Sequence, residues 1–225
     1  AQIIEKERLD RELQVAAEIQ KSILPQKLPQ VPGFDFGACM IPARMVGGDL
    51  YDVFPLDNER MGVLIGDVAD KGIPAAIFMA RTHALIMVEA VHGGSPGEIL
   101  LRANRHLINL QQADQFVTVL FGILDCRTGE VDFVRAGHEL PLLVFPDGDV
   151  ETFSYGPGQP IGILDSPLMD EQKITLPVGA TLLFFTDGVT DSANPQGEQF
   201  GHAQLNRSLA ALAGRNGQET CDLLL

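Results

Sequence analysis

Three aspartates that lie beside glycines at the edges of apolar segments could carry chemistry in this sequence. They are Asp49, Asp67 and Asp187, in the segments Val46–Asp52, Met61–Asp70 and Leu182–Gly188. An aspartate at the end of a strand more often forms a turn than binds a ligand, so each segment alone is weak support for a site. Three such segments together predict that the carboxylates meet in one cluster at the rim of a sheet.

Carboxylates that gather without histidine or cysteine favour Mg²⁺ or Mn²⁺ over zinc, because hard cations prefer oxygen ligands. Carboxylates that are brought close together also repel one another, and bound cations relieve that repulsion. Two such ions ~3.5–4 Å apart can lower the pKa of a water between them and hold a transferring phosphoryl group. The cluster therefore predicts hydrolysis of a phosphoester without a covalent enzyme intermediate.

Three further side chains are candidates for contact with the substrate or for proton transfer. Arg44 could bind a phosphate, although a salt bridge to a local acid is the more ordinary role of such a residue. Lys71 could attract the substrate phosphate or only offset the charge of Asp70. His138 could act as a general acid, but a histidine in a Gly-His turn between strands is more often a structural hydrogen-bonding residue.

The composition limits the class of protein. A chain of 225 residues can form one large domain, or a domain with an appendage. The net charge of −14 argues against nucleic-acid binding, which needs a clustered basic surface. We find no apolar run of the roughly 18 residues that a membrane span needs, and no signal peptide. Three widely spaced cysteines without a CxxC motif indicate a reduced, cytoplasmic protein.

The first 24 residues are predicted to form a linker helix. Apolar and polar seam positions alternate at spacings of four and three, as in a short coiled coil. These positions are Leu9, Leu13, Ala16, Gln20 and Ile23. Two interpretations stay open: the helix packs on its own domain, or it forms a homodimeric coiled coil below an upstream sensor, with Gln20 setting the register. No capping signal precedes the helix, which suggests a piece cut from a longer protein.

The remaining pattern predicts a mixed, layered fold rather than an alternating βαβ one. Helices are expected over residues 73–91, from a Ser95–Glu98 capping box to about 110, and from about 203. The first of these is apolar nearly all round and should be covered on both sides. Strands are expected at the following places. They are a half-buried strand over 34–38, a buried strand that ends at the Gly66–Asp67 turn, a hairpin over 116–124 and 130–136, and strands over 140–145, 173–176 and 181–186.

Five motifs occur in the order in which they are found in one phosphatase family. They are Ala17–Pro25, Val46–Asp52, Gly66–Gly72, Ala136–His138 and Thr186–Gly188. From about residue 17 to near its end the chain resembles the SpoIIE/RsbU branch of the bacterial PPM-type, metal-dependent protein serine/threonine phosphatases. Each motif alone is weak, whereas the ordered set is specific.

The resemblance implies an α+β fold, an α-β-β-α sandwich of two mainly antiparallel sheets flanked by helices. It implies a linker helix over residues 1–24, a phosphatase domain over 25–225, and a centre of two Mn²⁺ or Mg²⁺ ions between the sheets. Asp67 resembles the bridging ligand, Val68 the adjacent carbonyl ligand and Asp187 a direct ligand. Asp49 resembles the acid that supports the metal site, directly or through water.

The resemblance also implies partners and one departure. The usual substrate is a phosphoserine or phosphothreonine on an anti-sigma-factor antagonist, and an attached sensor or receiver domain usually drives the enzyme. The family pattern ends with a further Asp-Asp pair that completes the metal site, and no such pair follows Asp187 in these 225 residues. We therefore expect the chain as given to bind the second ion poorly.

Two other functions compete with the phosphatase. A catalytically silent module that binds a partner would suit the missing acid pair, but the presence of all three aspartates counts against it. A nucleotide cyclase is suggested by Gly47–Gly48–Asp49, but Leu50 stands where a second acid is required. The cyclase also leaves the segments around Asp67 and Asp187 unexplained.

Overall fold

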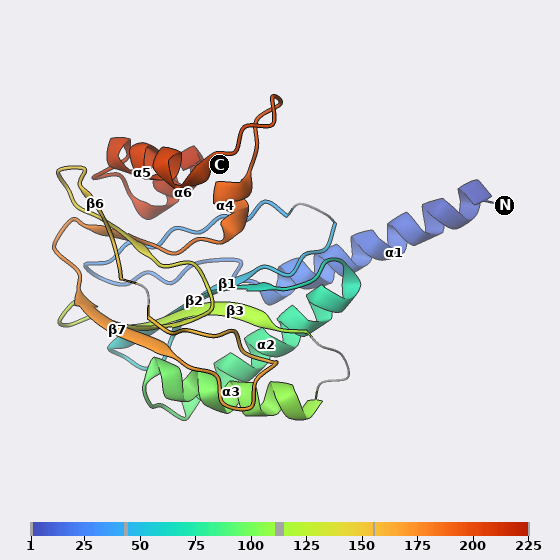
Figure 1. Ribbon diagram of the computed structural model, residues 1–225, viewed down its shortest axis with the longest axis horizontal. Coiled ribbons are helices and arrows are strands. Elements are labelled where there is room, and N and C mark those ends of the chain that lie inside the picture. The colour runs from blue at the N-terminus through green and yellow to red at the C-terminus, as the bar shows by residue number, and fades with distance from the viewer. Residues whose placement is uncertain (1, 43–44, 111–114, 155, 225) are drawn as a thin grey trace.

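The computed structural model describes residues 2–42, 45–110, 115–154 and 156–224 and contains two antiparallel sheets (Figure 1). The larger sheet has the order β1-β2-β3-β4-β7, and every neighbouring pair in it is antiparallel. Its strands are β1 Leu50–Pro55, β2 Arg60–Val68, β3 Val117–Asp125, β4 Glu130–Ala136 and β7 Asp170–Thr175. The smaller sheet has the order β6-β5-β8, with strands β5 Leu142–Val144, β6 Val150–Thr152 and β8 Thr181–Leu183.

Helices cover the two outer sides of this pair of sheets. On one side α2 (Ile73–Val91) and α3 (Pro96–Leu110) lie along the larger sheet, and on the other side α5 (Gly201–Ala211) and α6 (Gly217–Leu224) lie near the smaller one (Figure 1). A short helix, α4 (Asp187–Asp191), follows β8. The predicted α-β-β-α sandwich is therefore confirmed, and an alternating βαβ fold is excluded.

Strand β3 is the centre of the larger sheet and is buried on both faces. Successive side chains of a strand point to opposite faces. Accordingly Val119 and Phe121 pack toward α2 and α3, whereas Leu120 and Leu124 pack toward the layer of the smaller sheet. Because both faces are buried, the sequence of β3 is a nearly continuous apolar run and does not alternate between apolar and polar residues.

The predicted hairpin and helix caps agree with the structure. The hairpin joins β3 to β4, with Leu120 opposite Arg135. At the start of α3 the backbone N–H of Ser95 donates to Glu98 Oε2 at 3.0 Å, and the backbone N–H of Glu98 donates to Ser95 Oγ at 3.2 Å. These reciprocal bonds are the capping box that the sequence predicts.

Helix α2 differs from its prediction on its outer face. Phe78, Met79 and Ile86 are fully buried against the core, but Val88 and Val91 are exposed. The expectation of cover on both sides is therefore wrong for this part of the helix. Among the described residues α2 is also the helix that is long and apolar enough to cross a membrane. This is weak support for a span, because core helices of soluble proteins pass the same test.

The predicted strand over residues 34–38 is wrong. The segment makes one isolated bridge, between Val31 and Phe34, and then runs without strand pairing. Its backbone is engaged by α6 instead: the Gln218 side chain accepts from the Ala38 N–H at 3.4 Å and donates to the Ala38 carbonyl at 3.3 Å. An alternating apolar pattern indicates a half-buried face. Here Phe34 and Phe36 pack on the inner face of the larger sheet without pairing as a strand, while α6 holds the backbone.

Helix α1 (Gln2–Ile23) projects from the body of the domain, and its C-terminal part contacts α2 (Figure 1). Leu13, Ala16 and Ile23 are half-buried, whereas Leu9 is exposed on the projecting part. The predicted seam is therefore divided between a stretch that packs on its own domain and a stretch that is open to solvent.

Candidate metal centre

Asp49 and Asp67 face each other across two neighbouring strands. The ladder between β1 and β2 ends with Leu50 opposite Gly66, and one further step in this antiparallel register places Asp49 opposite Asp67. Cβ atoms of directly opposed residues lie roughly 4.5–5.5 Å apart. Each carboxyl group shifts the pKa of the other, so the two side chains are within interaction distance. Strand register therefore brings these two predicted ligands into contact.

The glycine before each aspartate lies close to a neighbouring backbone. A Cβ atom on Gly48 would lie 2.8 Å from the carbonyl oxygen of Val68, and one on Gly66 would lie 2.8 Å from the carbonyl oxygen of Thr118. Any side chain at these positions would push the backbones apart. Gly48 thus lets the turn before Asp49 rest on the end of β2, and Gly66 lets β2 lie close to β3.

The pKa values of both carboxyl groups are raised. Burial is the largest cause for each of them. For Asp67 the neighbouring charge of Asp49 adds to the effect and brings the pKa to about 7, while the charge of Lys71 acts in the opposite direction. A hydrogen bond between two carboxyl groups needs a proton on one of them. A hard divalent cation can take the place of that proton, so the oxygen-donor pair fits Mn²⁺ or Mg²⁺.

Asp187 lies near this pair without touching it. It is the exposed first residue of α4, and its charge raises the pKa of both Asp49 and Asp67 without a hydrogen bond to either. Within the described part of the chain, no three His, Cys, Asp or Glu side chains are close enough to hold a metal ion. The part of Asp187 as a direct ligand therefore stays a prediction.

The other predicted site residues have mixed placements. The carbonyl oxygen of Val68 rests against Gly48 and accepts the N–H of Asp70 at 2.8 Å, which leaves it a second lone pair for a ligand. Lys71 is exposed, with its charge near Asp67. Arg44 lies outside the residues that the structure describes.

His138 is a structural residue that connects the two sheets. Its Nδ1 lies 2.8 Å from Thr118 Oγ1 on β3, and its Nε2 lies 3.0 Å from the carbonyl oxygen of Phe185. Burial lowers the pKa of the ring to about 4, so the imidazole is neutral near pH 7, with Nε2–H donating to Phe185. Thr118 is paired with Asp67 on β2, and Phe185 is two residues before Asp187. His138 therefore positions the segments that carry two of the aspartates and is too deeply buried to serve as a general acid.

A buried ion pair supports the turn that contains His138. Arg135 Nε lies 3.1 Å from Asp170 Oδ2, and both side chains are more than nine-tenths buried. The same guanidinium donates to the carbonyl oxygens of His138 and Gly156, and the Gly156 N–H donates to Asp170. Sequence reasoning missed this network, because Arg135 and Asp170 are far apart in the chain and become neighbours only through the pairing of β4 with β7.

Gln20 is a second residue whose role the sequence did not indicate. Its Nε2 donates to the Gly47 carbonyl at 2.6 Å, and the Gly47 N–H donates to its Oε1 at 3.1 Å. This amide, at one seam position of the predicted helix, holds the turn that precedes Asp49. Helix α1 is thereby attached directly to the candidate centre.

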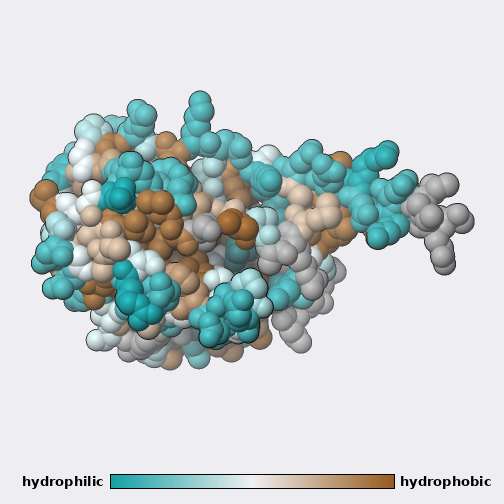
Figure 2. All heavy atoms as spheres, turned by 90° about the horizontal axis from the view of Figure 1, so that it is seen from above, coloured by the Kyte–Doolittle hydropathy of each residue, from teal (hydrophilic) through white to brown (hydrophobic). Residues whose placement is uncertain are grey.

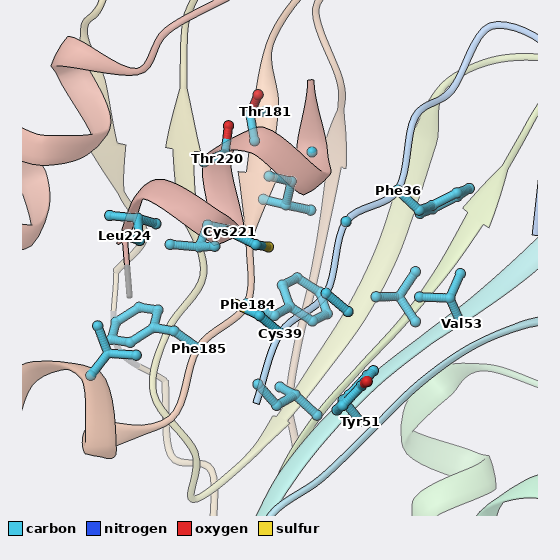
Figure 3. A pocket seen from close by; sticks show the side chains of 18 of the residues that line it. Phe36, Cys39, Tyr51, Val53, Thr181, Phe184, Phe185, Thr220, Cys221 and Leu224 are labelled. Atoms are coloured by element: carbon cyan, nitrogen blue, oxygen red, sulfur yellow. The ribbon is translucent and has the colours of Figure 1, made fainter. Parts of the chain in front are cut away.

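A cavity of about 930 Å³ lies between the two sheets and reaches the candidate centre. Asp49, Thr186 and Gly188 line it at that end. Figure 3 shows the aromatic rings of Phe36, Phe184 and Phe185 along its wall, with α6 on the other side. Asp49 therefore borders a large, mainly apolar space between the sheets.

Two solved structures share this fold. The SiaA-PP2C domain of Pseudomonas aeruginosa matches with a TM-score of 0.84 at 23% identity, over 98% of this chain and 89% of that one. The RsbU and RsbW domains of Rv1364c from Mycobacterium tuberculosis match with a TM-score of 0.67 at 25% identity, over 85% of this chain and 53% of that one. The fold is thus that of the PP2C-type phosphatases.

Residues 57–225 match the family described as Stage II sporulation protein E, and the chain belongs to this SpoIIE family. Protein IcfG of Synechocystis is 29% identical over 89% of this chain and 36% of its own length. Phosphoserine phosphatase RsbU of Bacillus subtilis is 28% identical over 85% of this chain and 57% of its own length. The chain therefore spans only part of the length of these curated relatives.

Proposed function

We propose that this domain hydrolyses phosphoserine or phosphothreonine on a regulatory protein of the anti-sigma-factor antagonist type, with two Mn²⁺ or Mg²⁺ ions as cofactors. The contact between the Asp49 and Asp67 carboxyl groups, with the charge of Asp187 beside them, carries this proposal. Membership of the SpoIIE family supports it, as does the name of the relative RsbU, a phosphoserine phosphatase.

Each residue has a distinct part in the proposed reaction. Asp67, Asp187 and the carbonyl of Val68 would bind the ions, with Asp67 shared between them, and Asp49 would support the site. Bound divalent cations supply Lewis-acid activation of water and neutralise phosphoryl charge. Lys71 and Arg44 would attract the substrate phosphate. The buried, neutral His138 holds the turn before Asp187 in place and transfers no proton.

Hydrolysis of an aryl phosphate tests the proposed function. We expect the complete domain to turn over the aryl phosphate with Mn²⁺ and not with a chelator, because the reaction needs the cation. The Asp187→Asn variant should lose this activity, since it removes a predicted ligand. Asp191→Asn is the matched control, because Asp191 is an exposed acid at the other end of α4 and should keep the activity of the parent. Equal rates with and without metal would reject the mechanism.

A catalytically silent binding module is the second candidate. The observation that favours it is the absence, among the described residues, of three acids close enough to hold an ion. If the domain bound a phosphorylated antagonist protein but turned over neither that protein nor an aryl phosphate with Mn²⁺, this second function would replace the first.

The proposal extends to the surroundings of the domain. Residues 1–24 would be a linker to a sensor or receiver domain, and residues 25–225 the phosphatase domain, in a cytoplasmic protein. The exposed apolar residues of the projecting helix and of α2 would form the interface of a homodimer. These residues are Leu9, Val15, Ile19, Ile77, Val88 and Val91.

Replacing Leu9 by aspartate should dissociate this homodimer. Leu9 is exposed in the monomer, so the new charge would not disturb the fold but would be buried at a coiled-coil seam. Gln14→Asp is the matched control, because Gln14 is an exposed residue off the seam and the change in charge is the same. Light scattering should give a lower mass for the first variant alone. If a chain that begins at Pro25 has the same oligomeric state as the parent, helix α1 is not the interface.

A further inference from the structure

The segment that leads to the Asp49 turn packs directly against α6. A Cβ atom on Gly37 would lie 2.0 Å from the carbonyl carbon of Gly217, so the two backbones touch. The N–H of Gly217 donates to Asp35, and the Gln218 side chain is bonded to the backbone of residue 38 through both of its amide atoms. This stretch of chain is therefore fixed against the first turn of α6.

Each of the two segments in contact carries one cysteine a few residues further along the chain. Cys221 lies four residues after Gly217 and so falls on the same face of α6, and Cys39 lies two residues after Gly37, on the same side of an open chain. Four residues of helix advance roughly 6 Å, and two residues of extended chain advance roughly 6.6 Å. The two segments consequently bring their thiols to the same level.

Both cysteines line the cavity between the sheets (Figure 3). The interaction between their thiols lowers the pKa of the exposed Cys39 thiol and raises the pKa of the buried Cys221 thiol. A thiolate, rather than a thiol, is the nucleophile in exchange reactions. The pair thus has an accessible attacking group with a second thiol in contact behind it.

We infer that Cys39 and Cys221 are an oxidation site that closes to an intramolecular disulfide on reaction with a disulfide oxidant such as glutathione disulfide. The Cys39 thiolate attacks one sulfur of the oxidant, which forms a mixed disulfide and releases one glutathione thiolate. The Cys221 thiol loses its proton to solvent and attacks the Cys39 sulfur, and the second glutathione thiolate leaves. Two cysteine thiols are oxidised, and one glutathione disulfide is reduced to two molecules of glutathione.

The new bond would join the segment before Asp49 to α6 and would enclose most of the domain in one covalent loop. Such a cross-link lowers the conformational entropy of the unfolded chain, so the oxidised domain should resist unfolding better than the reduced one. In a cytoplasmic protein, disulfides of this kind are transient and responsive to redox conditions rather than permanent. The proposed oxidation site does not depend on the proposed phosphatase activity, so an experiment can reject either proposal without rejecting the other.

The test uses the whole chain with Cys126→Ser, which removes the third cysteine, a half-buried residue in the turn between β3 and β4. After treatment with glutathione disulfide we expect the loss of both free thiols, no bound glutathione, and one cross-linked peptide that contains residues 39 and 221 by mass spectrometry. Dithiothreitol should restore both thiols. A stable glutathione adduct on Cys39 with Cys221 still free, or two unreacted thiols, would overturn the inference.

Thermal unfolding provides a second readout. The oxidised C126S protein should melt at a higher temperature than the reduced protein, and dithiothreitol should remove the difference. Adding Cys39→Ser, a change at an exposed position, should leave the melting temperature insensitive to the oxidant. If the oxidant shifts the melting temperature equally with and without this change, the effect does not come from the pair.

Discussion

Replacing Asp67 by asparagine is expected to stabilise the metal-free domain and to abolish its metal-dependent activity. The pKa of Asp67 is raised to about 7 by burial and by the charge of Asp49. Its folded-state pKa is thus above its unfolded value of 3.8. The stability that the protonated group contributes is therefore fully present below pH 3.8 and is lost as the pH rises through about 7. At pH 8 the ionised group destabilises the fold, and asparagine removes that charge.

The expected gain at pH 8 is about 1–2 kcal/mol in the free energy of unfolding, after allowance for solvent screening at a half-exposed group. Denaturant titration in a chelator measures it. With Mn²⁺ the parent should become more stable and Asp67→Asn should not, because the ligand is lost. Mn²⁺-dependent turnover should fall by at least about a hundredfold, since even residues that only support metal ligands cost roughly 10–100-fold.

Asp70→Asn is the control for this experiment, because Asp70 is an exposed acid three residues further along the same turn. It should leave both the metal-free stability and the response to Mn²⁺ near those of the parent. If Asp67→Asn destabilised the metal-free domain, or still gained stability from Mn²⁺, the proposed electrostatic conflict at this pair would be wrong.

The second large effect is expected at the buried ion pair. Arg135→Ala should lower the free energy of unfolding by about 3–5 kcal/mol, because it leaves the buried Asp170 carboxylate without its partner. The change also removes the donors to the carbonyl oxygens of His138 and Gly156. The turn that supports His138 would loosen with it, so activity with Mn²⁺ should fall at temperatures where the domain is still folded.

Two comparisons test whether the unpaired buried charge causes the predicted loss of stability in Arg135→Ala. Arg127→Ala removes an exposed arginine that pairs with Glu59, and it should change stability by no more than about 0.5 kcal/mol. Replacing both Arg135 and Asp170 by apolar residues of similar size should cost less than Arg135→Ala alone, because no charge stays buried without a partner. If the double replacement were as destabilising as the sum of the single ones, the pair would not act as a unit.

The parts of the fold that were predicted correctly depend on neighbours in the sequence. The capping box of Ser95 and Glu98 and the hairpin of β3 and β4 are examples, since each is decided within a few residues. The failed strand over 34–38 depends instead on distant parts of the chain, because its phenylalanines pack on the larger sheet and its backbone is held by α6. The alternation of apolar and polar residues predicted that one side of that segment is covered, but it did not predict which elements cover it.

The candidate site also has features that the sequence predicted and features that it did not. The glycine turns beside the aspartates predicted a cluster of carboxylates, and the structure supplies the register that places Asp49 and Asp67 opposite each other. The contact of Gln20 with Gly47 was not predictable, because a glutamine on a helix suits a coiled-coil seam and a backbone contact equally well. Motif order also placed His138 among the functional residues, but only its burial and its two bonds show that it holds segments together.

The order in which the chain visits the two sheets has a mechanical consequence. After β4 the chain leaves the larger sheet for β5 and β6, returns for β7, and leaves again for β8. Because three connections join the two sheets, neither sheet can separate and unfold independently of the other. Asp49 and Asp67 belong to one layer and Asp187 follows the last strand of the other. Loss of the centre should therefore coincide with collapse of the entire sandwich, rather than accompany a hinge-like parting of its halves.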